Sequence, residues 1–315
     1  MKKGSGPTQR SLRDRGIAVI RRRRTPKRDV TGVMYLLGVS ILVLTSSPTS
    51  ADGRLIATGG ATQIEGSAGG GITPWAVLGG YGTAGQNGAT GFVSAVNTGD
   101  YRLDAIGASW IWNNRIELSA ARQDLDLGAL STKLGLPQDE RLGLDVLGAK
   151  VRVVGDIIYG ELPQVSIGMQ HKRQRDFEVP ETVGAEDDTG TDVYVSVGRL
   201  FLAGVAGRNV YVNATARSTR ANELGLLGFG GPGGNDREWM IEGAVAMFLD
   251  RRTAVGVEHR QKPENLAFAE DDWNSVFVAW FPSKKMSLTA AWVDLGSIAT
   301  LDNQRGLYLS AEVTF

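Results

Sequence analysis

The chain has 315 residues, with 34 Lys or Arg, 34 Asp or Glu, 42 Gly and no Cys. The lack of Cys excludes disulfides and thiolate metal sites. Residues 1–51 hold 11 basic and 2 acidic residues, so the rest of the chain has 23 basic and 32 acidic residues and a formal charge of −9. Such an acidic chain argues against nucleic-acid binding, which usually requires a basic surface.

The N-terminal residues have the three parts of a secretory signal peptide. A basic stretch that includes Arg21–Arg24 precedes an apolar run of 11 residues, Met34–Leu44, and a small-residue site follows at Thr49–Ala51. An apolar run of this length is too short to cross a bilayer as a helix, which needs roughly 18 residues. We expect residues 1–51 to be a signal peptide with a long basic n-region, cleaved after Ala51. A nucleic-acid-binding arm is the alternative interpretation of the arginines.

Residues 52–88 are rich in Gly and Ala and contain one strand-like run, Thr73–Tyr81. Two arrangements are open for them. They form either a further hairpin, which would give fourteen strands, or an N-terminal segment inside the lumen of a barrel. We favour the second arrangement, with the barrel itself formed by residues 89–315.

Twelve strand-like runs follow at regular intervals, each about as long as a tilted barrel strand. They lie at 89–97, 102–112, 115–124, 143–154, 157–170, 191–202, 209–218, 238–249, 253–262, 273–281, 286–293 and 306–315.

The connections between these runs alternate in length, with one exception: the first outer connection, around Asn97 to Asp100, is short. Outer-membrane barrels have short periplasmic turns and longer extracellular loops, and a soluble sandwich has no reason to sort its connections in this way. The pattern therefore predicts an all-β, transmembrane antiparallel barrel of about twelve strands. The long connections are 125–142, 171–190, 219–237, 263–272 and 294–305, and the short ones are 113–114, 155–156, 203–208, 250–252 and 282–285.

The last strand alternates apolar and polar residues and ends on an aromatic residue. Side chains of a strand alternate between its faces, so one face of this strand is apolar. A C-terminal strand of this kind is typical of outer-membrane barrels and predicts a signal for the barrel-assembly machinery, formed by Leu307, Leu309, Ala311, Val313 and Phe315.

Aromatic residues gather towards the strand ends, as in the interfacial girdles of membrane barrels. Aromatic core residues of a soluble β protein are the alternative. The residues are Trp110, Trp112, Phe201, Trp239, Trp273, Trp280, Phe281, Trp292 and Phe315.

Ionisable residues on the less apolar face of the strands are expected to point into the lumen, because they are costly against lipid. Two interpretations compete. The charges form a selective constriction for a small hydrophilic solute, or they pair across a narrow, mostly filled barrel and hold it shut. We favour pairing slightly. The candidates are Glu117, Lys150, Arg152, Gln170, Arg217, Glu242, Glu258, Arg260 and Glu312.

A second polar group lies where the run 253–262 passes into a long connection. It predicts either a solvated loop or an outer patch that binds a ligand or a divalent ion bridging lipopolysaccharide. Its residues are His259, Lys262, Glu264, Asn265, Glu270, Asp271 and Asp272.

Neither enzymatic nor nucleotide chemistry has a convincing motif. The only histidines, His171 and His259, have no zinc-binding spacing and no recognisable Ser nucleophile beside them. The Gly-rich stretch 228–234 lacks the pattern of a phosphate-binding loop. We therefore expect no catalytic residue, no metal and no cofactor.

Several segments resemble an uncharacterised bacterial family known as domain of unknown function 3034. The resemblance covers about residues 53–315, and it implies an exported outer-membrane protein without assigning any catalytic or binding residue. It rests on Ile72–Ala76, Gly225–Gly231, Glu258–Pro263, Phe277–Pro282 and Ser287–Gly296.

These observations predict a bacterial outer-membrane barrel that acts as a narrow passive pore or a structural envelope component. The alternatives are a barrel-embedded enzyme that acts on lipid or an envelope polymer, and a surface protein that binds through its long loops. The expected partners are outer-membrane lipid, lipopolysaccharide and the barrel-assembly machinery, and any small solute is left undefined.

Overall fold

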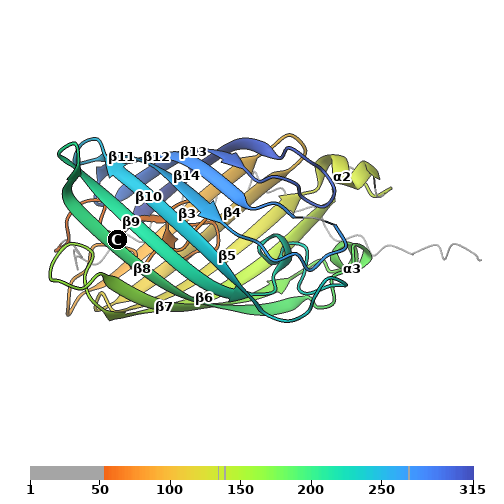
Figure 1. Cartoon of the computed structure of the whole chain (residues 1–315), viewed down its shortest axis with the longest axis horizontal. Helices are drawn as coiled ribbons and strands as arrows, with labels where there is room; N and C mark the ends of the chain where they lie inside the picture. The colour runs from red at the N-terminus through yellow and green to blue at the C-terminus, as the bar shows by residue number, and fades with distance from the viewer. Residues whose placement is uncertain (1–52, 134, 138–139, 269) are drawn as a thin grey trace, which may run out of the picture. The chain divides into compact units, whose positions relative to one another are not determined.

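The structure, a computed structural model, describes residues 53–315 apart from 134, 138–139 and 269. The predicted signal peptide and its cleavage site at Ala51 lie outside the described residues. The described part is dominated by a closed barrel of twelve antiparallel strands that run obliquely to its axis (Figure 1). The barrel strands are β3 (Asn87–Asn97), β4 (Arg102–Trp112), β5 (Ile116–Asp126), β6 (Arg141–Val154), β7 (Gln164–Gln174), β8 (Thr189–Val205), β9 (Arg208–Thr219), β10 (Glu238–Phe248), β11 (Thr253–Arg260), β12 (Trp273–Ser283), β13 (Met286–Asp294) and β14 (Arg305–Thr314).

Each strand pairs with its neighbours in the sequence, and β14 pairs with β3 to close the barrel. The closing register runs from Leu307 opposite Asn97 to Thr314 opposite Thr90. Beyond the last strand residue, the backbone of Phe315 exchanges two hydrogen bonds with that of Ala89, at 2.8 and 3.2 Å. The prediction of twelve strands, rather than fourteen, is confirmed.

The outer face of the barrel is apolar because alternate residues of each strand point away from the lumen. Many large aliphatic side chains on this face are between 38 and 62% exposed, which matches the lipid-facing surface of a transmembrane barrel. Examples from five strands are Leu118, Leu147, Ile167, Val245 and Val276.

Exposed tryptophans border this apolar face at both ends of the barrel. Trp110, Trp112 and Trp280 lie near short turns, and Trp239 and Trp292 lie near long connections. This arrangement is that of the two interfacial girdles of a membrane barrel.

Two predicted girdle residues point inwards instead. Trp273 and Phe281 are 3 and 4% exposed, because both occupy the inward register of β12. Their assignment to the girdle was wrong.

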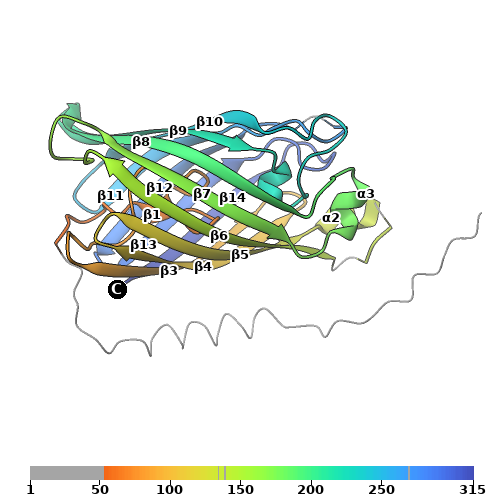
Figure 2. The same ribbon diagram turned by 90° about the horizontal axis from the view of Figure 1, so that it is seen from below.

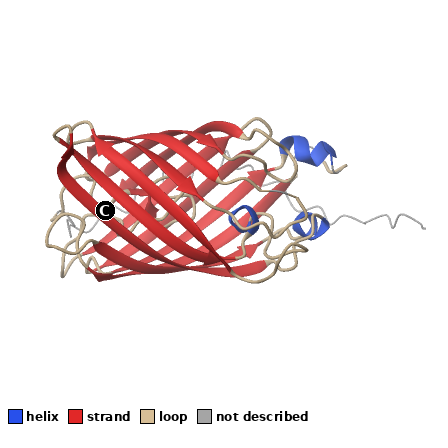
Figure 3. Cartoon of the chain, viewed as in Figure 1, coloured by secondary structure: helices blue, strands red, loops and turns tan. Residues whose placement is uncertain are grey.

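The connections are sorted by length as predicted, apart from a long loop at 155–163 among the short turns and a short connection at 98–101 among the long ones. Short turns join the strands at the end of the barrel where β3 begins and β14 ends, which we call the turn end. Long connections lie at the opposite end, the loop end, which also carries the short helices (Figure 3). These helices are α2 (Gly128–Lys133), α3 (Glu178–Thr182) and the 3-10 helix η1 (Asn222–Gly225). None of the helices in the described residues is long and apolar enough to span a membrane.

One strand and one turn differ from the prediction. The run 157–170 was expected to be a strand after a two-residue turn, but residues 155–163 form a loop and β7 begins at Gln164. Gly155 has a φ of +76°, which ends β6 in a conformation that favours glycine. Asp156 Oδ1 then accepts hydrogen bonds from the amides of Ile158 and Tyr159, at 2.9 and 3.0 Å. This Asx turn satisfies amides that a strand would have used.

Residues 53–86, which we call the plug, precede β3 and are drawn in orange in Figure 2. Backbone amides of the plug contact inward-facing side chains of the barrel wall. Every residue from Ala57 to Gly82 is buried. The plug contains a two-stranded hairpin of β1 (Ala61–Thr62) and β2 (Ala68–Gly69). The strand expected at Thr73–Tyr81 was wrong, since this run is irregular and uses its amides on wall side chains.

Candidate functional site

The inward register of the strands places most of the predicted lumen residues in the interior. Eight of the nine are at most 7% exposed, namely Glu117, Lys150, Gln170, Arg217, Glu242, Glu258, Arg260 and Glu312. The ninth, Arg152, lies at the turn end, where its partly exposed side chain is 3.4 Å from the Asp156 carboxylate.

Six charged side chains meet inside the barrel, three acidic and three basic. We call them the central cluster, and each is 3% exposed or less. One comes from the plug and five come from strands β7 to β11: Glu65, Lys172, Asp192, Arg217, Glu242 and Arg260.

Glu65 is the member of the cluster that belongs to the plug. Arg260 Nη1 lies 2.7 Å from its Oε2, and Arg217 Nη2 lies 3.7 Å from the same oxygen. Lys172 Nζ contacts the other oxygen, Oε1. A single carboxylate of the plug therefore faces three cations of the wall.

The wall members of the cluster also pair with one another. Asp192 Oδ2 lies 2.6 Å from Lys172 Nζ and 3.2 Å from Arg217 Nη1. Glu242 Oε1 lies 3.6 Å from Arg260 Nε and also contacts Arg217 Nε. The charges of the cluster sum to zero, so burial is compensated within it. Removing one partner of such a buried network typically costs about 3–5 kcal/mol, because an uncompensated charge is left behind.

A second ion pair lies between the plug and strands β5 and β6. Lys150 Nζ lies 3.2 Å from Glu117 Oε1 and donates a hydrogen bond of 2.9 Å to the carbonyl of Ala68. The amides of Ala68 and Gly79 donate to the two oxygens of Glu117, at 3.0 and 2.8 Å. Both ends of this pair therefore bind backbone groups of the plug.

The carboxylate of Glu258 is held by three consecutive plug amides. Gly71, Ile72 and Thr73 donate hydrogen bonds of 2.8, 3.2 and 3.2 Å to it. Gly70 allows this approach, because a Cβ at this position would lie 2.1 Å from Glu258 Oε1. Glu312 similarly accepts a hydrogen bond of 2.5 Å from the hydroxyl of Thr62. Six of the eight charged lumen candidates thus contact the plug, whereas Glu242 pairs with cations of the wall and Arg152 with Asp156.

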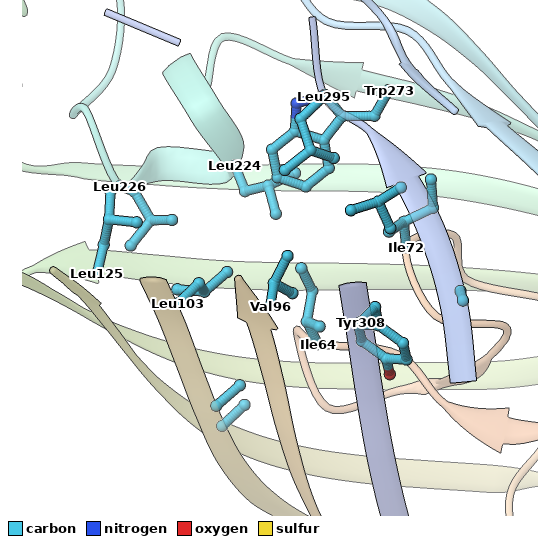
Figure 4. Close-up of a cluster of buried hydrophobic side chains, with 14 of the residues drawn as sticks. Ile64, Ile72, Val96, Leu103, Leu125, Leu224, Leu226, Trp273, Leu295 and Tyr308 are labelled. Atoms are coloured by element: carbon cyan, nitrogen blue, oxygen red, sulfur yellow. The ribbon is translucent and has the colours of Figure 1, made fainter. Parts of the chain in front are cut away.

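The loop end is closed by two connections, 220–237 and 261–272, which we call the cap. Leu224 and Leu226 of the cap lie with inward side chains of the wall and plug in one apolar cluster (Figure 4). The space left there is a cavity of only about 30 Å³. Lys172 of the central cluster donates a 3.0 Å hydrogen bond to the carbonyl of Leu224 and so links the cap to the cluster.

Buried polar residues join the two connections of the cap. Lys262 Nζ lies 2.5 Å from Glu223 Oε1 and 3.9 Å from Glu270 Oε2. Asn265 donates a hydrogen bond of 2.9 Å to the side chain of Asn222. Burial, together with the nearby carboxylate of Glu223, raises the pKa of Glu270 to about 8. Burial also raises the pKa of Glu223.

The predicted outer-loop patch is divided by this arrangement. Lys262, Asn265 and Glu270 are buried, because they tie the connection 261–272 to η1. The remaining four residues do not share the buried interior: Glu264 and Asp271 are exposed, Asp272 is partly exposed, and His259 lies on the outer face of β11. The seven residues therefore do not form one exposed surface.

Both histidines point away from the lumen. His171 Nδ1 lies 3.0 Å from the hydroxyl of Thr191, and His259 Nδ1 lies 2.9 Å from the side-chain oxygen of Asn274. Within the described residues, no group of three or more His, Cys, Asp or Glu is placed to hold a metal ion.

Three members of the central cluster were not predicted from the sequence. Lys172 was assigned to a loop because β7 was expected to end at residue 170. The alternation of Gln170, Lys172 and Gln174 on one face of β7 is a signal that indicates the longer strand. Asp192 lies at the start of β8, and Glu65 lies in the plug, where no periodicity marks its direction.

Comparisons with solved structures find outer-membrane barrels among the matches. The KdgM porin aligns with a TM-score of 0.47 and 9% identity, over 72% of this chain and 99% of its own. Omp33 of Acinetobacter baumannii has a TM-score of 0.42 and 10% identity, over 73 and 98%. The NanC porin has a TM-score of 0.42 and 11% identity, over 72 and 98%. At these values the likenesses carry no argument about function, and a search of curated proteins found no match.

A family model described as "Protein of unknown function (DUF3034)" matches residues 58–312. The match includes most of the plug and nearly the whole barrel wall, so it covers the charged interior described above. The chain therefore belongs to this family.

Proposed function

We propose that the protein is a passive outer-membrane barrel that is closed in its resting state and acts as a structural component of the envelope. Conduction through its lumen requires displacement of the plug. The observation that carries this proposal is the central cluster, because its charged side chains form ion pairs with one another and with Glu65 of the plug.

The other plug contacts support a closed lumen. An open pore leaves its charged lining in water, where the charges act on passing solutes. Here Glu117, Lys150 and Glu258 bind backbone groups of the plug, and the cap covers the loop end. A solute that enters at one end therefore meets a chain of hydrogen bonds and ion pairs rather than a water-filled channel.

The apolar outer face and its two aromatic girdles support a location in the outer membrane. We propose that the chain is exported by its N-terminal residues and cleaved after Ala51. We also propose that the barrel has no enzymatic activity, since His171 and His259, the two residues considered for a hydrolase, both lie on the outer face.

Conductance in planar bilayers tests the closed state. We expect the wild-type protein to be almost silent and Glu65→Gln to show frequent openings, because this variant leaves an excess positive charge in the buried cluster and weakens the hold on the plug. The double variant Glu65→Gln/Arg260→Gln restores neutrality and should open less often than the single variant.

Arg122→Gln is the matched control. Arg122 forms an ion pair of 2.9 Å with Asp145 on the outside of the barrel, where both side chains are more than 40% exposed. Exposed pairs contribute about 0–1 kcal/mol, so this variant should behave as the wild type does. A large, steady conductance of the wild-type protein would show that the closed state is wrong.

A further inference from the structure

The turn end of the barrel contains an apolar cavity of about 640 Å³. Its size lies within the range of roughly 300–1,000 Å³ found for small-molecule sites. The central cluster does not line it. Its walls come from strands β8 to β13, the loop 155–163 and the plug. Its apolar lining includes Trp75, Val77, Tyr211, Ala246, Phe277 and Phe281.

Small side chains on the wall create this space. Ala246, Ala254 and Ala279 are inward residues of three neighbouring strands and are at most 5% exposed. On the plug side, Gly60 and Gly70 contribute no side chain to the lining, and Ala57 and Ala61 contribute small ones. A void with such a lining binds water poorly and favours an apolar occupant.

Three aromatic rings form the inner part of the cavity. The ring centroid of Trp75 lies 4.9 Å from that of Tyr211 and 6.3 Å from that of Phe277. All three are less than 10% exposed. The plug therefore contributes the aromatic ring of Trp75 to the cavity, in addition to the hydrogen bonds and ion pairs that it forms with charged side chains of the wall.

The cavity opens at the turn end. Its lining includes three exposed leucines: Leu55 of the plug, Leu202 of β8 and Leu249 of the turn after β10. They are 56, 62 and 38% exposed. Apolar side chains that are both exposed and part of a cavity mark its mouth. An apolar molecule can thus reach the cavity without passing the plug or the cap.

The charged residues at the mouth are mainly basic. Arg208, Arg251 and Lys284 line it, against one acidic residue, Asp250. The carboxylate of Asp250 accepts hydrogen bonds from the amides of Arg252 and Thr253 within its own turn, at 2.6 and 2.9 Å. The mouth therefore favours an anionic group.

We propose that the cavity binds a single-chain anionic amphiphile, with one acyl chain inside and a carboxylate or phosphate head at the basic mouth. The volume of about 640 Å³ suits one chain rather than the two chains of a phospholipid. Long-chain fatty acids and lysophospholipids share this chemistry. This binding goes beyond the proposed closed barrel, because it uses a space that the plug leaves at the turn end.

Fluorescence quenching tests the proposal on the whole protein, extracted from membranes in a steroid-based detergent that has no acyl chain. The probe is stearic acid brominated at mid-chain, since bromine quenches tryptophan at short range. We expect a saturable component of quenching in the wild type that disappears in Trp75→Phe. Other tryptophans on the outer face report only the unsaturable partitioning of the probe into detergent.

Two further variants separate the chain from the head group. Ala246→Phe fills the cavity and should weaken saturable binding at least tenfold, whereas Ala290→Phe, on the outer face of β13, should leave it unchanged. Arg208→Gln/Arg251→Gln should weaken binding of the acid severalfold. Stearyl alcohol should displace the probe poorly from the wild type. Because it has no charged head group, its own affinity should be the same for the wild type and for the arginine variant.

Competition on the wild type needs no variant to fold. Unlabelled stearic acid and a lysophosphatidate are compared as displacing ligands, and the stronger one identifies the source of the head group. The proposal is overturned if quenching never saturates, if filling the cavity leaves binding unchanged, or if stearyl alcohol displaces the probe as well as stearic acid does.

Discussion

Individual residues of the plug matter because they lie against charged side chains of the wall. Glu258 cannot move away from Gly70 without losing the hydrogen bonds from Gly71, Ile72 and Thr73. The absence of a side chain at residue 70 is therefore a requirement of the interior. The Gly-rich composition of residues 52–88, for which an extra hairpin was the alternative to a segment inside the lumen, allows close packing at this point.

Gly70→Ala should destabilise the folded barrel by about 1–3 kcal/mol, the usual cost of inserting a methyl group into a packed interior. The reason is the 2.1 Å approach of the new Cβ to Glu258 Oε1. The loss is measured on a denaturing gel, on which the folded barrel and the unfolded chain run at different positions. The conversion temperature is the temperature of prior heating at which the folded band is replaced by the unfolded one. Gly99→Ala is the control, because a Cβ there meets no atom within 4 Å. Equal conversion temperatures for the two variants would contradict the packing argument.

At the scale of elements, the cap depends on the protonation of Glu270. Its raised pKa means that the folded cap keeps a proton which the unfolded chain has already lost above a pH of about 4.3. The folded state binds more protons than the unfolded state up to a pH of about 8, so stability falls as the pH rises through this window. The positive charge of Lys262 stabilises the ionised form of Glu270 in part, whereas the carboxylates of Glu223 and Glu264 destabilise it.

Glu270→Gln should remove most of this dependence. The conversion temperature of the wild type is expected to fall relative to that of the variant between pH 5 and pH 8, and the difference should level off above pH 8. Parallel curves for the two proteins would show that Glu270 does not control the cap. The exposed neighbour Asp271 provides the control variant Asp271→Asn.

The closing strand β14 combines a structural and a predicted recognition role. Its link to β3 beyond the last strand residue uses the backbone of Phe315, while the Phe315 side chain is 41% exposed on the outside. Phe315→Ala should therefore reduce the amount of assembled protein in the outer membrane severalfold, with little change in the conversion temperature of the protein that does assemble.

Leu118→Ala is the comparison for this variant. Leu118 is also exposed on the outer face, at 48%, but it lies on β5. If both variants lower assembly to the same extent, a general loss of apolar surface explains the effect and the assembly signal is not needed.

On the scale of the whole molecule, the interior changes in character along the barrel axis. Apolar side chains and the buried ion pairs of the cap fill the loop end, the central cluster holds balanced charges, and the turn end contains an apolar cavity. The turn end is also basic, with Arg251, Arg252, Lys284 and Lys285 in its turns. The lumen residues predicted from the sequence are polar, and the structure adds to them an apolar cavity at the turn end.

Strand β12 contains the sequence signal for the apolar layer that was missed. Residues 276–281 are all apolar, so both faces of the strand are apolar over this stretch. In a barrel with a water-filled lumen one face would be polar. Such a run indicates that the inner face meets apolar material, here the cavity and Trp75 of the plug.

The sequence by itself determined the barrel, its twelve strands, the sorting of long and short connections and the inward direction of most lumen candidates. These features follow from the two-residue period of a strand, which any short segment reveals. Only the tertiary structure decided that Glu65 meets Arg260, 195 residues away, that cap residues such as Lys262 are buried, and that inward alanines border a cavity. Those outcomes depend on which segments share the lumen after the barrel closes, and no local pattern in the chain records that choice.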